Sequence, residues 1–331
     1  MAPTPLILDV DTGVDDLVAL LYAIASPEVD LIATTCVTGN VHVDRATRNT
    51  LHTLELASAE HVEVARGAAS PLVQPWEPFP VVHGEEGLGR YEPPVPERTI
   101  SARDAATLIV QEARRRPGEI LFVATGPLTN VALAVEMEPR LPELLAGFAL
   151  MGGAFREGGN VTPRAEANVW MDPDAAARVF QGWSGAAPAQ LPRCLGLDVT
   201  EQVWVSMEDV EAACAPAPSS PLARLLTDSI GYYAEFYAST GRYGGACMHD
   251  PLAVAAAIDP SLCAWAPTRV EVELAGRWTR GETVTDLLGI RSSPWSDWGS
   301  EDNAVVATAV DGATVVGRMV QRLRELVAAR S

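Results

Sequence analysis

The chain has 331 residues, of which 48% are hydrophobic and 20% are charged. These proportions are typical of a globular protein with a sizeable core. The formal net charge of -19 argues against nucleic acid or an anionic membrane as a partner, because the chain is poorly suited to neutralise phosphates.

Cysteine usage and the N-terminal sequence bear on the compartment. An odd, sparse set of cysteines without a CxxC pair is typical of reduced thiols rather than of a disulfide framework. The N-terminus lacks a basic segment followed by a long apolar one, and no apolar run is long enough for a membrane helix. We therefore expect a soluble, cytoplasmic protein. The cysteines are Cys36, Cys194, Cys214, Cys247 and Cys263.

Strand-like and helix-like segments alternate over the first half of the chain. The pattern predicts strands at residues 6–10, 29–37, 62–65, 120–124 and 148–151. It predicts helices at residues 15–25, 43–57, 102–116 and 129–138. Short apolar runs rich in Val and Ile favour parallel strands buried on both faces. The fold class that we predict is α/β, with a Rossmann-like open, mostly parallel sheet flanked by helices.

The second half continues with further helices and strands. The expected helices lie at residues 174–181, 221–239, from Pro251 onward, and at 312–329; the expected strands lie at 193–199, 269–274 and 283–288. No internal repeat or low-complexity linker divides the chain, which predicts one domain over residues 1–331. Two irregular stretches, the Pro-rich 67–96 and the Gly-rich, polar 152–168, are predicted to be active-site loops.

Four aspartates lie within eight residues near the start of the chain: Asp9, Asp11, Asp15 and Asp16. An apolar strand precedes them and a helical pattern follows, so they gather at the carboxyl end of the first strand, where open α/β sheets bind ligands. Like charges this close repel unless a cation or a proton is shared, which predicts a hard divalent metal. Asp15 and Asp16 can also be explained as favourable charges in a first helical turn. That alternative leaves Asp9 and Asp11 unexplained.

Polar residues also follow other predicted strands. Asn40 ends the second strand, Thr125 to Asn130 form a Gly-Pro turn after another, and a polar stretch ends at Asn168. Each can be turn chemistry or helix capping alone. Together they offer amides and carboxylates that suit a polyhydroxylated ligand. In His249-Asp250-Pro251, capping of the next helix would account for the aspartate but not for the histidine.

Six motifs, in this order, resemble one family. They are the run from Asp9 to Asp16, Gly39-Asn40, His83 to Gly89, Thr125 to Asn130, Gly159 to Asn168, and His249-Asp250-Pro251. The family is that of the nucleoside hydrolases, the inosine–uridine-preferring type of N-ribohydrolase. The resemblance extends over the whole chain. It implies Ca²⁺-dependent hydrolysis of the N-glycosidic bond of ribonucleosides, by direct attack of water on an oxocarbenium-like ribose.

The resemblance also implies a role for particular residues. Asp11 would be the general base toward a metal-bound water, and His249 would assist the leaving base. The implied Ca²⁺ ligands are Asp11, Asp16, the backbone carbonyl of Thr125, and Asp250. The implied substrate-binding residues are Asp15, Asn40, His83, Asn160, Glu166 and Asn168. Tyr237, in an aromatic run on the helix predicted at 221–239, can stack on the base, although core packing is an equally good explanation for it.

The resemblance leaves some properties open. Ala167 stands where many relatives carry an aromatic residue, so a preference for purines or pyrimidines does not follow. We expect a small ribonucleoside as substrate, a role in nucleotide salvage, and a homodimer or homotetramer, as is common among relatives.

Two other classes of function fit part of the sequence. A DxD start also occurs in haloacid-dehalogenase phosphotransferases, where Asp9 would be the nucleophile and Mg²⁺ the metal. That class needs a downstream lysine, and this sequence contains arginines but no lysine. A relative that binds nucleosides or ribosyl groups without turnover is the other alternative. Release of free ribose from a nucleoside distinguishes it from a hydrolase.

Overall fold

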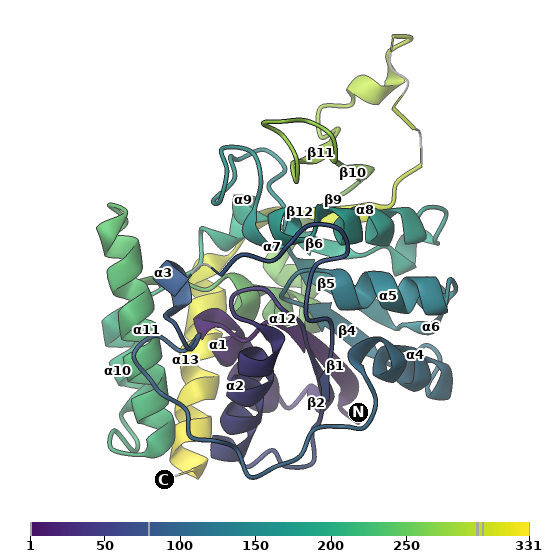
Figure 1. Cartoon of the computed structure of the whole chain (residues 1–331). Coiled ribbons are helices and arrows are strands. Elements are labelled where there is room, and N and C mark those ends of the chain that lie inside the picture. Colours follow the sequence, from purple (N-terminus) through teal and green to yellow (C-terminus); the bar gives the residue numbers. More distant parts are fainter. Residues whose placement is uncertain (1, 79, 296–297, 300, 331) are drawn as a thin grey trace.

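An eight-stranded sheet runs through the centre of the protein in this computed structural model, which describes residues 2–78, 80–295, 298–299 and 301–330 (Figure 1). All neighbouring strands are parallel except the last pair, β12 and β9, which is antiparallel. The open, mostly parallel sheet confirms the predicted fold class. Its order is β3 (Glu63–Arg66), β2 (Val29–Cys36), β1 (Thr4–Val10), β4 (Leu121–Ala124), β5 (Gly147–Met151), β6 (Arg193–Leu195), β12 (Ala304–Val310) and β9 (Cys263–Thr268).

Helices cover both faces of the sheet (Figure 1). One apolar core contains residues of α1 (Val14–Ile24), α2 (Val43–Leu56), α10 (Met207–Cys214), α11 (Pro221–Ser239), α12 (His249–Ile258) and α13 (Gly312–Ala329). A second core contains residues of α4 (Ala105–Arg115), α5 (Thr129–Met137), α6 (Leu141–Leu144), α7 (Ala167–Met171) and α8 (Pro173–Gly182). A search of the described residues finds no helix long and apolar enough to cross a membrane.

Side chains of strand β1 point alternately into the two apolar cores. Leu6, Leu8 and Val10 belong to the first core, whereas Ile7 belongs to the second. This alternation follows from the two-residue repeat of a strand. Asp9 therefore points to the same face as Ile7, and only beyond the end of the strand can the following aspartates gather elsewhere.

The strand order changes direction at β1. The chain proceeds from β1 outward to β2 and β3 on one side, and β4 to β6 lie on the other. Connections diverge at this point, which is where ligands bind in doubly wound sheets. The residues after β1 and β4 therefore lie at the same switch point of the sheet.

Several predicted elements differ from the structure. The strand expected at 193–199 ends at Leu195, and α9 (Leu197–Thr200) follows because Gly196 packs against the backbone of Gly153. A Cβ at Gly196 would lie 2.8 Å from that carbonyl oxygen. The helix expected from Pro251 begins at His249, so Asp250 lies in its first turn and does not cap it.

Other elements were not predicted or lie outside the main sheet. Strands β9 and β12 were not predicted. The expected strands at 269–274 and 283–288 form shorter strands of a separate hairpin, β10 (Val270–Val272) and β11 (Thr283–Thr285). This hairpin and the following segment project from the body of the protein (Figure 1). The other short elements of the described chain are α3 (Pro80–His83), β7 (Trp204–Val205), β8 (Ala246–Cys247) and three 3-10 helices, η1 (Pro188–Gln190), η2 (Pro260–Leu262) and η3 (Ile290–Ser292). All five cysteines are buried and free.

Candidate active site

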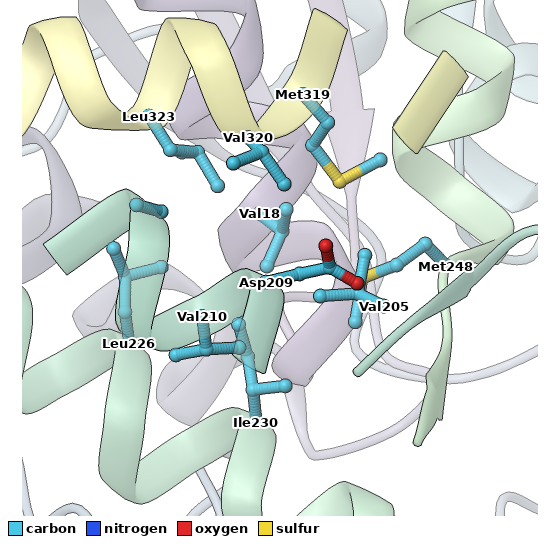
Figure 2. A pocket seen from close by; sticks show the side chains of 11 residues that line it. Val18, Val205, Asp209, Val210, Leu226, Ile230, Met248, Met319, Val320 and Leu323 are labelled. Atoms are coloured by element: carbon cyan, nitrogen blue, oxygen red, sulfur yellow. The ribbon is translucent and has the colours of Figure 1, made fainter. Parts of the chain in front are cut away.

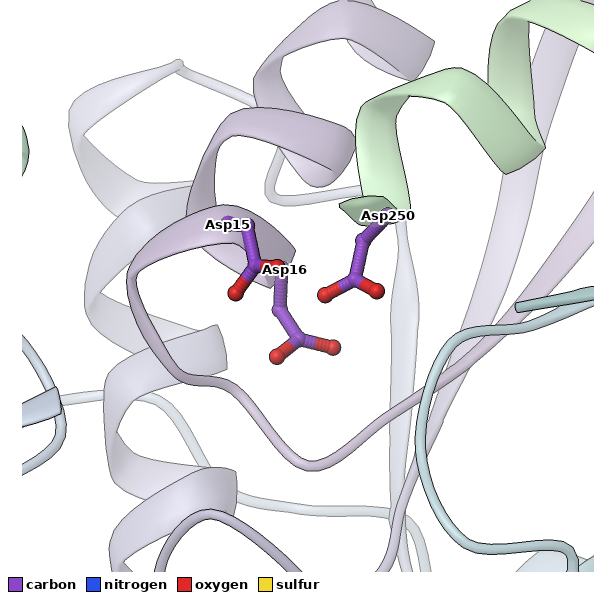
Figure 3. Close-up of side chains that lie close together, drawn as sticks. All are labelled: Asp15, Asp16 and Asp250. Carbon is purple, nitrogen blue, oxygen red and sulfur yellow. The ribbon is translucent and has the colours of Figure 1, made fainter. Parts of the chain in front are cut away.

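Three aspartates from two segments far apart in sequence meet near the carboxyl end of β1. Asp15 and Asp16 lie in the first turn of α1, and Asp250 lies in the first turn of α12 (Figure 3). One carboxylate oxygen of each lies within 4.8 Å of the others, and all three residues are buried. Helices α1 and α12 pack against each other, which brings residues 235 positions apart in sequence into one cluster.

Neighbouring elements fix the carboxylate of Asp16. Its Oδ2 accepts hydrogen bonds from the backbone N–H of Gly13 at 2.9 Å and from the amide of Asn40 at 3.2 Å. Its Oδ1 accepts a hydrogen bond from the hydroxyl of Thr125 at 2.7 Å. The structure thus brings together the polar residues that follow β1, β2 and β4, as their positions at the strand ends predicted.

Asp11 is held at one oxygen and free at the other. The backbone N–H of Asn40 donates to Oδ2 at 2.6 Å, whereas Oδ1 is buried without a hydrogen-bond partner in the part of the chain that the structure describes. The backbone comes so close that a Cβ at Gly39 would lie 2.0 Å from Oδ2, and one at Gly126 would lie 2.9 Å from Oδ1. Both turns therefore need glycine to leave room for this carboxylate.

The raised pKa values of the clustered aspartates indicate that a positive charge would stabilise this site. Burial, followed by repulsion from neighbouring aspartates, holds the pKa of Asp11, Asp15 and Asp250 well above the ordinary value. Burial also raises the pKa of Asp16. Oδ1 of Asp15, like that of Asp11, is buried with no hydrogen-bond partner among the described residues. Buried, mutually repelling carboxylates with free oxygens fit a hard cation such as Ca²⁺.

Among the aspartates, the cluster differs in one member from the ligand set that the sequence resemblance implied. The closest group contains Asp15 with Asp16 and Asp250, whereas Asp11 lies beside the turn at Gly126. The carbonyl of Thr125 accepts a hydrogen bond from the side chain of Asn168 at 2.6 Å.

Asp9 takes no part in this cluster. Its Oδ1 accepts hydrogen bonds from Thr35 at 2.5 Å and from Asn130 at 2.8 Å. Burial raises its pKa to about 7, and these two hydrogen bonds oppose the shift. Both hydrogen bonds hold Oδ1 of Asp9 against the sheet and away from the aspartate cluster. Asn130 also donates to Cys36 O at 3.1 Å and accepts from Ala68 N at 2.9 Å, so it ties the start of the Pro-rich loop to the sheet.

The polar segment 152–168 brings further groups to the same edge. Glu166 is buried, and its carboxylate accepts backbone hydrogen bonds from Gly153 at 2.9 Å, Asn168 at 2.8 Å and Val169 at 3.1 Å. Asn168 is buried as well, whereas Asn160 is exposed and accepts a hydrogen bond from Ala167 N at 2.9 Å. Both oxygens of Glu166 are thus oriented by backbone.

His249 belongs to a chain of hydrogen bonds. Its Nδ1 lies 2.8 Å from the hydroxyl of Thr200, and its Nε2 lies 2.8 Å from the hydroxyl of Tyr237. The hydroxyls of Tyr237 and Tyr233 lie 3.1 Å apart. Burial lowers the pKa of His249 to about 4. At neutral pH the imidazole is therefore uncharged, and both of its ring nitrogens face hydroxyl groups.

His83 approaches the cluster from the Pro-rich loop. Its Nδ1 accepts the backbone N–H of Val14 at 3.1 Å and lies 3.9 Å from Oδ1 of Asp15. Burial lowers its pKa to about 3, so the ring is neutral and its hydrogen must be on Nε2. The ring centroid lies 5.1 Å from that of Tyr233. His83 thus offers one N–H donor on the side toward the aromatic residues of α11.

The aromatic run on α11 divides into two sets. Tyr233 and Tyr237 are buried toward His83 and His249, whereas Tyr232 donates to Val81 O in the Pro-rich loop. Sequence reasoning placed Tyr237 here but did not single out Tyr233 or Thr200 as site residues. The four-residue spacing of the two tyrosines on one helix face was a usable signal for Tyr233. No local pattern in the sequence marks Thr200, because α9 comes close to His249 only in the folded chain.

A small cavity below the cluster is unrelated to this site. Its volume is about 10 Å³, and apolar side chains of α1, α10, α11 and α13 line most of it (Figure 2). Asp209, the one acidic residue at its edge, accepts hydrogen bonds from Ser206 at the start of α10. A space of this size and character is a packing defect rather than a binding site.

Comparison with known proteins assigns this constellation to one group. The sequence model of the family described as inosine-uridine preferring nucleoside hydrolase matches residues 6–317. The chain is 34% identical to the probable uridine nucleosidase 2 of Arabidopsis thaliana, over 97% of each chain. It is also 34% identical to the pyrimidine-specific ribonucleoside hydrolase RihA of Citrobacter koseri, over 96% of this chain and 97% of that one. The purine-preferring ribonucleoside hydrolase from Gardnerella vaginalis has a similar structure, with 32% identity, a TM-score of 0.89 and coverage of 98% and 99%.

Proposed function

Because this chain belongs to the family of inosine-uridine preferring nucleoside hydrolases, we propose that it cleaves ribonucleosides to free base and ribose with Ca²⁺ bound at the aspartate cluster. The observation that carries this proposal is the meeting of Asp15, Asp16 and Asp250 beside the unpartnered oxygen of Asp11. A catalytic cation, a base for water and sugar ligands are the groups that this reaction needs.

The proposed metal ligands are Asp11, Asp16, Asp250 and the carbonyl of Thr125, with Asp15 close enough to share in the site. A bound Ca²⁺ would lower the pKa of a coordinated water and help to hold the sugar hydroxyls. Asp11 would take the proton from the attacking water, since its Oδ1 has no other partner among the described residues. We expect inversion at the anomeric carbon, because water attacks directly.

Sugar binding is proposed for the polar groups at the same edge. Glu166 presents a carboxylate that three backbone amides orient, which lets it accept hydrogen bonds from sugar hydroxyls without reorganising. Asp15, Asn160 and Asn168 would provide the remaining contacts. Asn40 would act indirectly, because its backbone and side chain hold Asp11 and Asp16.

The leaving base is proposed to lie beside His83 and the chain formed by His249, Tyr237 and Tyr233. Both imidazoles are neutral at pH 7 because burial lowers their pKa values. His83 would donate a hydrogen bond through Nε2, whereas His249, whose ring nitrogens face the hydroxyls of Thr200 and Tyr237, would act through the hydroxyl of Tyr237. Hydrogen bonds to the departing base stabilise the negative charge that develops on it. We propose that loops 67–96 and 152–168 border the substrate on these two sides.

The experiment that tests this function measures ribose release. Inosine, adenosine, guanosine, uridine and cytidine would be incubated with metal-stripped enzyme, with and without added Ca²⁺. We expect turnover that depends on Ca²⁺ and about one tightly held Ca²⁺ per chain on metal analysis. Full ribose release by protein that contains no Ca²⁺ would contradict the role of the metal. Binding without release would favour the non-hydrolytic alternative.

Deoxynucleosides test the sugar contacts. If Asp15, Glu166 and Asn168 bind ribose hydroxyls, kcat/KM for 2′-deoxyuridine should fall below that for uridine by on the order of 10⁴-fold, since buried polar groups lose their partner. Equal values for the two substrates would exclude these roles. The relatives named above differ in base, so the same panel also decides the base preference.

Assembly and physiological role follow the family in this proposal. We propose a homodimer or homotetramer that acts in cytoplasmic nucleotide salvage. Sedimentation velocity at several concentrations would test the assembly, and a single species of monomer mass would contradict it.

A further inference from the structure

One four-residue helix touches both halves of the proposed site. Helix α9 (Leu197–Thr200) follows β6 and lies beside the segment that leads to Glu166. At its first turn Asp198 contacts residues 155–157, and at its end Thr200 contacts His249. The helix thus joins the proposed sugar side to the proposed base side.

The carboxylate of Asp198 accepts hydrogen bonds from three consecutive backbone N–H groups. Its Oδ2 accepts a hydrogen bond from Phe155 N at 2.8 Å. Its Oδ1 accepts hydrogen bonds from Arg156 N at 2.7 Å and from Glu157 N at 3.3 Å. A carboxylate that accepts several backbone N–H groups fixes the path of that backbone, because charge-assisted hydrogen bonds are about twice as strong as neutral ones.

The residues just before this turn are held by β6 and by the same helix. Leu197 N in α9 donates to Gly153 O at 2.9 Å, and Gly152 N donates to Leu195 O, at the end of β6, at 3.1 Å. Gly153 N in turn donates to Glu166 at 2.9 Å. The orientation of the Glu166 carboxylate therefore depends on a backbone segment that β6 holds before Gly153 and α9 holds at Gly153 and beyond it.

We propose that Asp198 is a positioning residue for sugar recognition. Its carboxylate fixes the backbone of segment 153–157, and Gly153 in that segment orients Glu166. Thr200 on the same helix positions His249 for the leaving base. Asp198 is separate from the ligand and substrate-binding residues assigned above. This inference rests on the proposed function in taking Glu166 as a sugar ligand and, for Thr200, in taking His249 as the residue that assists the leaving base.

The chain offers a matched control for Asp198. Asp286, half-buried like Asp198, also accepts three backbone hydrogen bonds, from Leu288 at 3.2 Å, Ile290 at 2.9 Å and Arg291 at 2.6 Å. These amides lie in the segment that projects from the body of the protein (Figure 1). Asp286→Ala thus removes the same kind of interaction at another place.

Substrate discrimination is the decisive kinetic measurement. We expect Asp198→Ala to reduce the preference for uridine over 2′-deoxyuridine by roughly ten- to a hundredfold, mainly through KM for uridine, because displaced groups lose their alignment. Asp198→Asn keeps one acceptor oxygen and should retain an intermediate preference. Asp286→Ala should retain the wild-type preference. Simple loss of folded enzyme lowers both rates equally and leaves the ratio unchanged.

Thr200→Val separates the two ends of α9. It should leave the uridine to 2′-deoxyuridine ratio unchanged, and slow uridine more than 4-nitrophenyl riboside, whose leaving group needs little assistance. Asp198→Ala should slow these two ribosides alike. A wild-type uridine to 2′-deoxyuridine ratio in Asp198→Ala would overturn the proposal for Asp198.

Hydrogen exchange measured on the intact chain decides the proposal even if wild-type protein releases no ribose. Amides of residues 155–157 should exchange at least about tenfold faster in Asp198→Ala than in wild-type protein, and ribose should protect segment 152–168 less. Asp286→Ala should speed exchange only at residues 288–291. Wild-type exchange at 155–157 in Asp198→Ala would overturn the inference, whereas lack of turnover in the wild-type protein would overturn only the proposed function.

Discussion

The carboxylates at the carboxyl end of β1 differ sharply from those at the surface of the same protein. Asp44 is 2.6 Å from Arg66, and this hydrogen bond lowers its pKa. Glu63 is likewise paired with Arg103, which lowers its pKa. Asp11 and Asp250 are buried among like charges, which raises theirs. Arginine side chains thus compensate the negative charge of these surface carboxylates. The carboxylates of the site require a cation instead.

In this acidic protein, the carboxylates of the proposed cation site are thus distinguished from other carboxylates by their burial and by the like charges around them. Arginines pair with carboxylates at many places on the surface, such as Asp259 with Arg318. Burial of unpaired carboxylates costs free energy of folding, which natural sequences retain mainly where it serves function. The unpaired cluster is therefore the place where substitutions should affect activity most and surface substitutions least.

The largest expected effect follows from Asp11→Asn. The amide is a poor base and a weaker metal ligand, so kcat should fall by about 10⁴-fold, the upper end of what general base catalysis contributes. The measurement is ribose release from the preferred nucleoside at saturating Ca²⁺. Asp44→Asn, at a paired surface carboxylate, is the control and should keep wild-type kcat. A loss of kcat below tenfold in Asp11→Asn would contradict the proposed difference between the carboxylates of the site and those of the surface.

His249→Ala should have the next largest effect. Natural nucleosides should be slowed by about 10²–10⁴-fold, the usual contribution of assistance to a leaving group, whereas 4-nitrophenyl riboside should be slowed little. Parallel kcat measurements on the two substrates test this. Equal losses would mean that His249 only positions Asp250, and no loss on either would make it a structural residue.

Removal of Ca²⁺ should expose the repulsion within the cluster. The folded-state pKa values of Asp11 and Asp250 are raised well above the ordinary value by burial and by repulsion from neighbouring aspartates. Raised carboxyl pKa values give stability that is present below the unfolded pKa near 4 and is lost as pH rises through the folded pKa. Metal-free protein should therefore become less stable as pH rises above about 4.

Added Ca²⁺ should counter that loss. At 1,000 times its dissociation constant, a ligand that binds only the folded state contributes about 4 kcal/mol. Thermal unfolding of metal-stripped protein at pH 5 and pH 7.5, with and without Ca²⁺, should show the larger rise in Tm at the higher pH. An equal or larger rise at pH 5 would contradict the repulsion between these carboxylates.

The smallest effect is expected at the surface. Arg66→Ala removes an exposed ion pair with Asp44, which should cost about 0–1 kcal/mol of unfolding free energy and leave kcat/KM unchanged. Urea unfolding at low and high salt measures this. A cost well above that range would show that surface pairing contributes more to the stability of this acidic chain than isolated ion pairs usually do.

Much of the fold could be predicted from local sequence patterns. Strands β1, β2 and β4 and helices α1, α2, α5, α11 and α13 fall close to their expected ranges, because each strand contains a short apolar run and each helix has a helix-like apolar pattern. Strands β9 and β12 were missed although the run Ala304–Val310 is apolar and rich in Val. The start of α12 was misplaced because Asp250-Pro251 has the pattern of a cap, while packing against α1 extends the helix back to His249.

The sequence by itself determined which side chains are available: aspartates after the first strand, an amide after the second, and a His-Asp pair near residue 250. Only the tertiary structure decided which of them meet. Packing of α12 on α1 brings Asp250 to Asp15 and Asp16, and burial lowers the pKa values of His83 and His249. Helix α9 contacts the backbone that orients Glu166, and its Thr200 hydroxyl contacts His249. These relations depend on distance and solvent exclusion between segments remote in sequence, which no local pattern encodes.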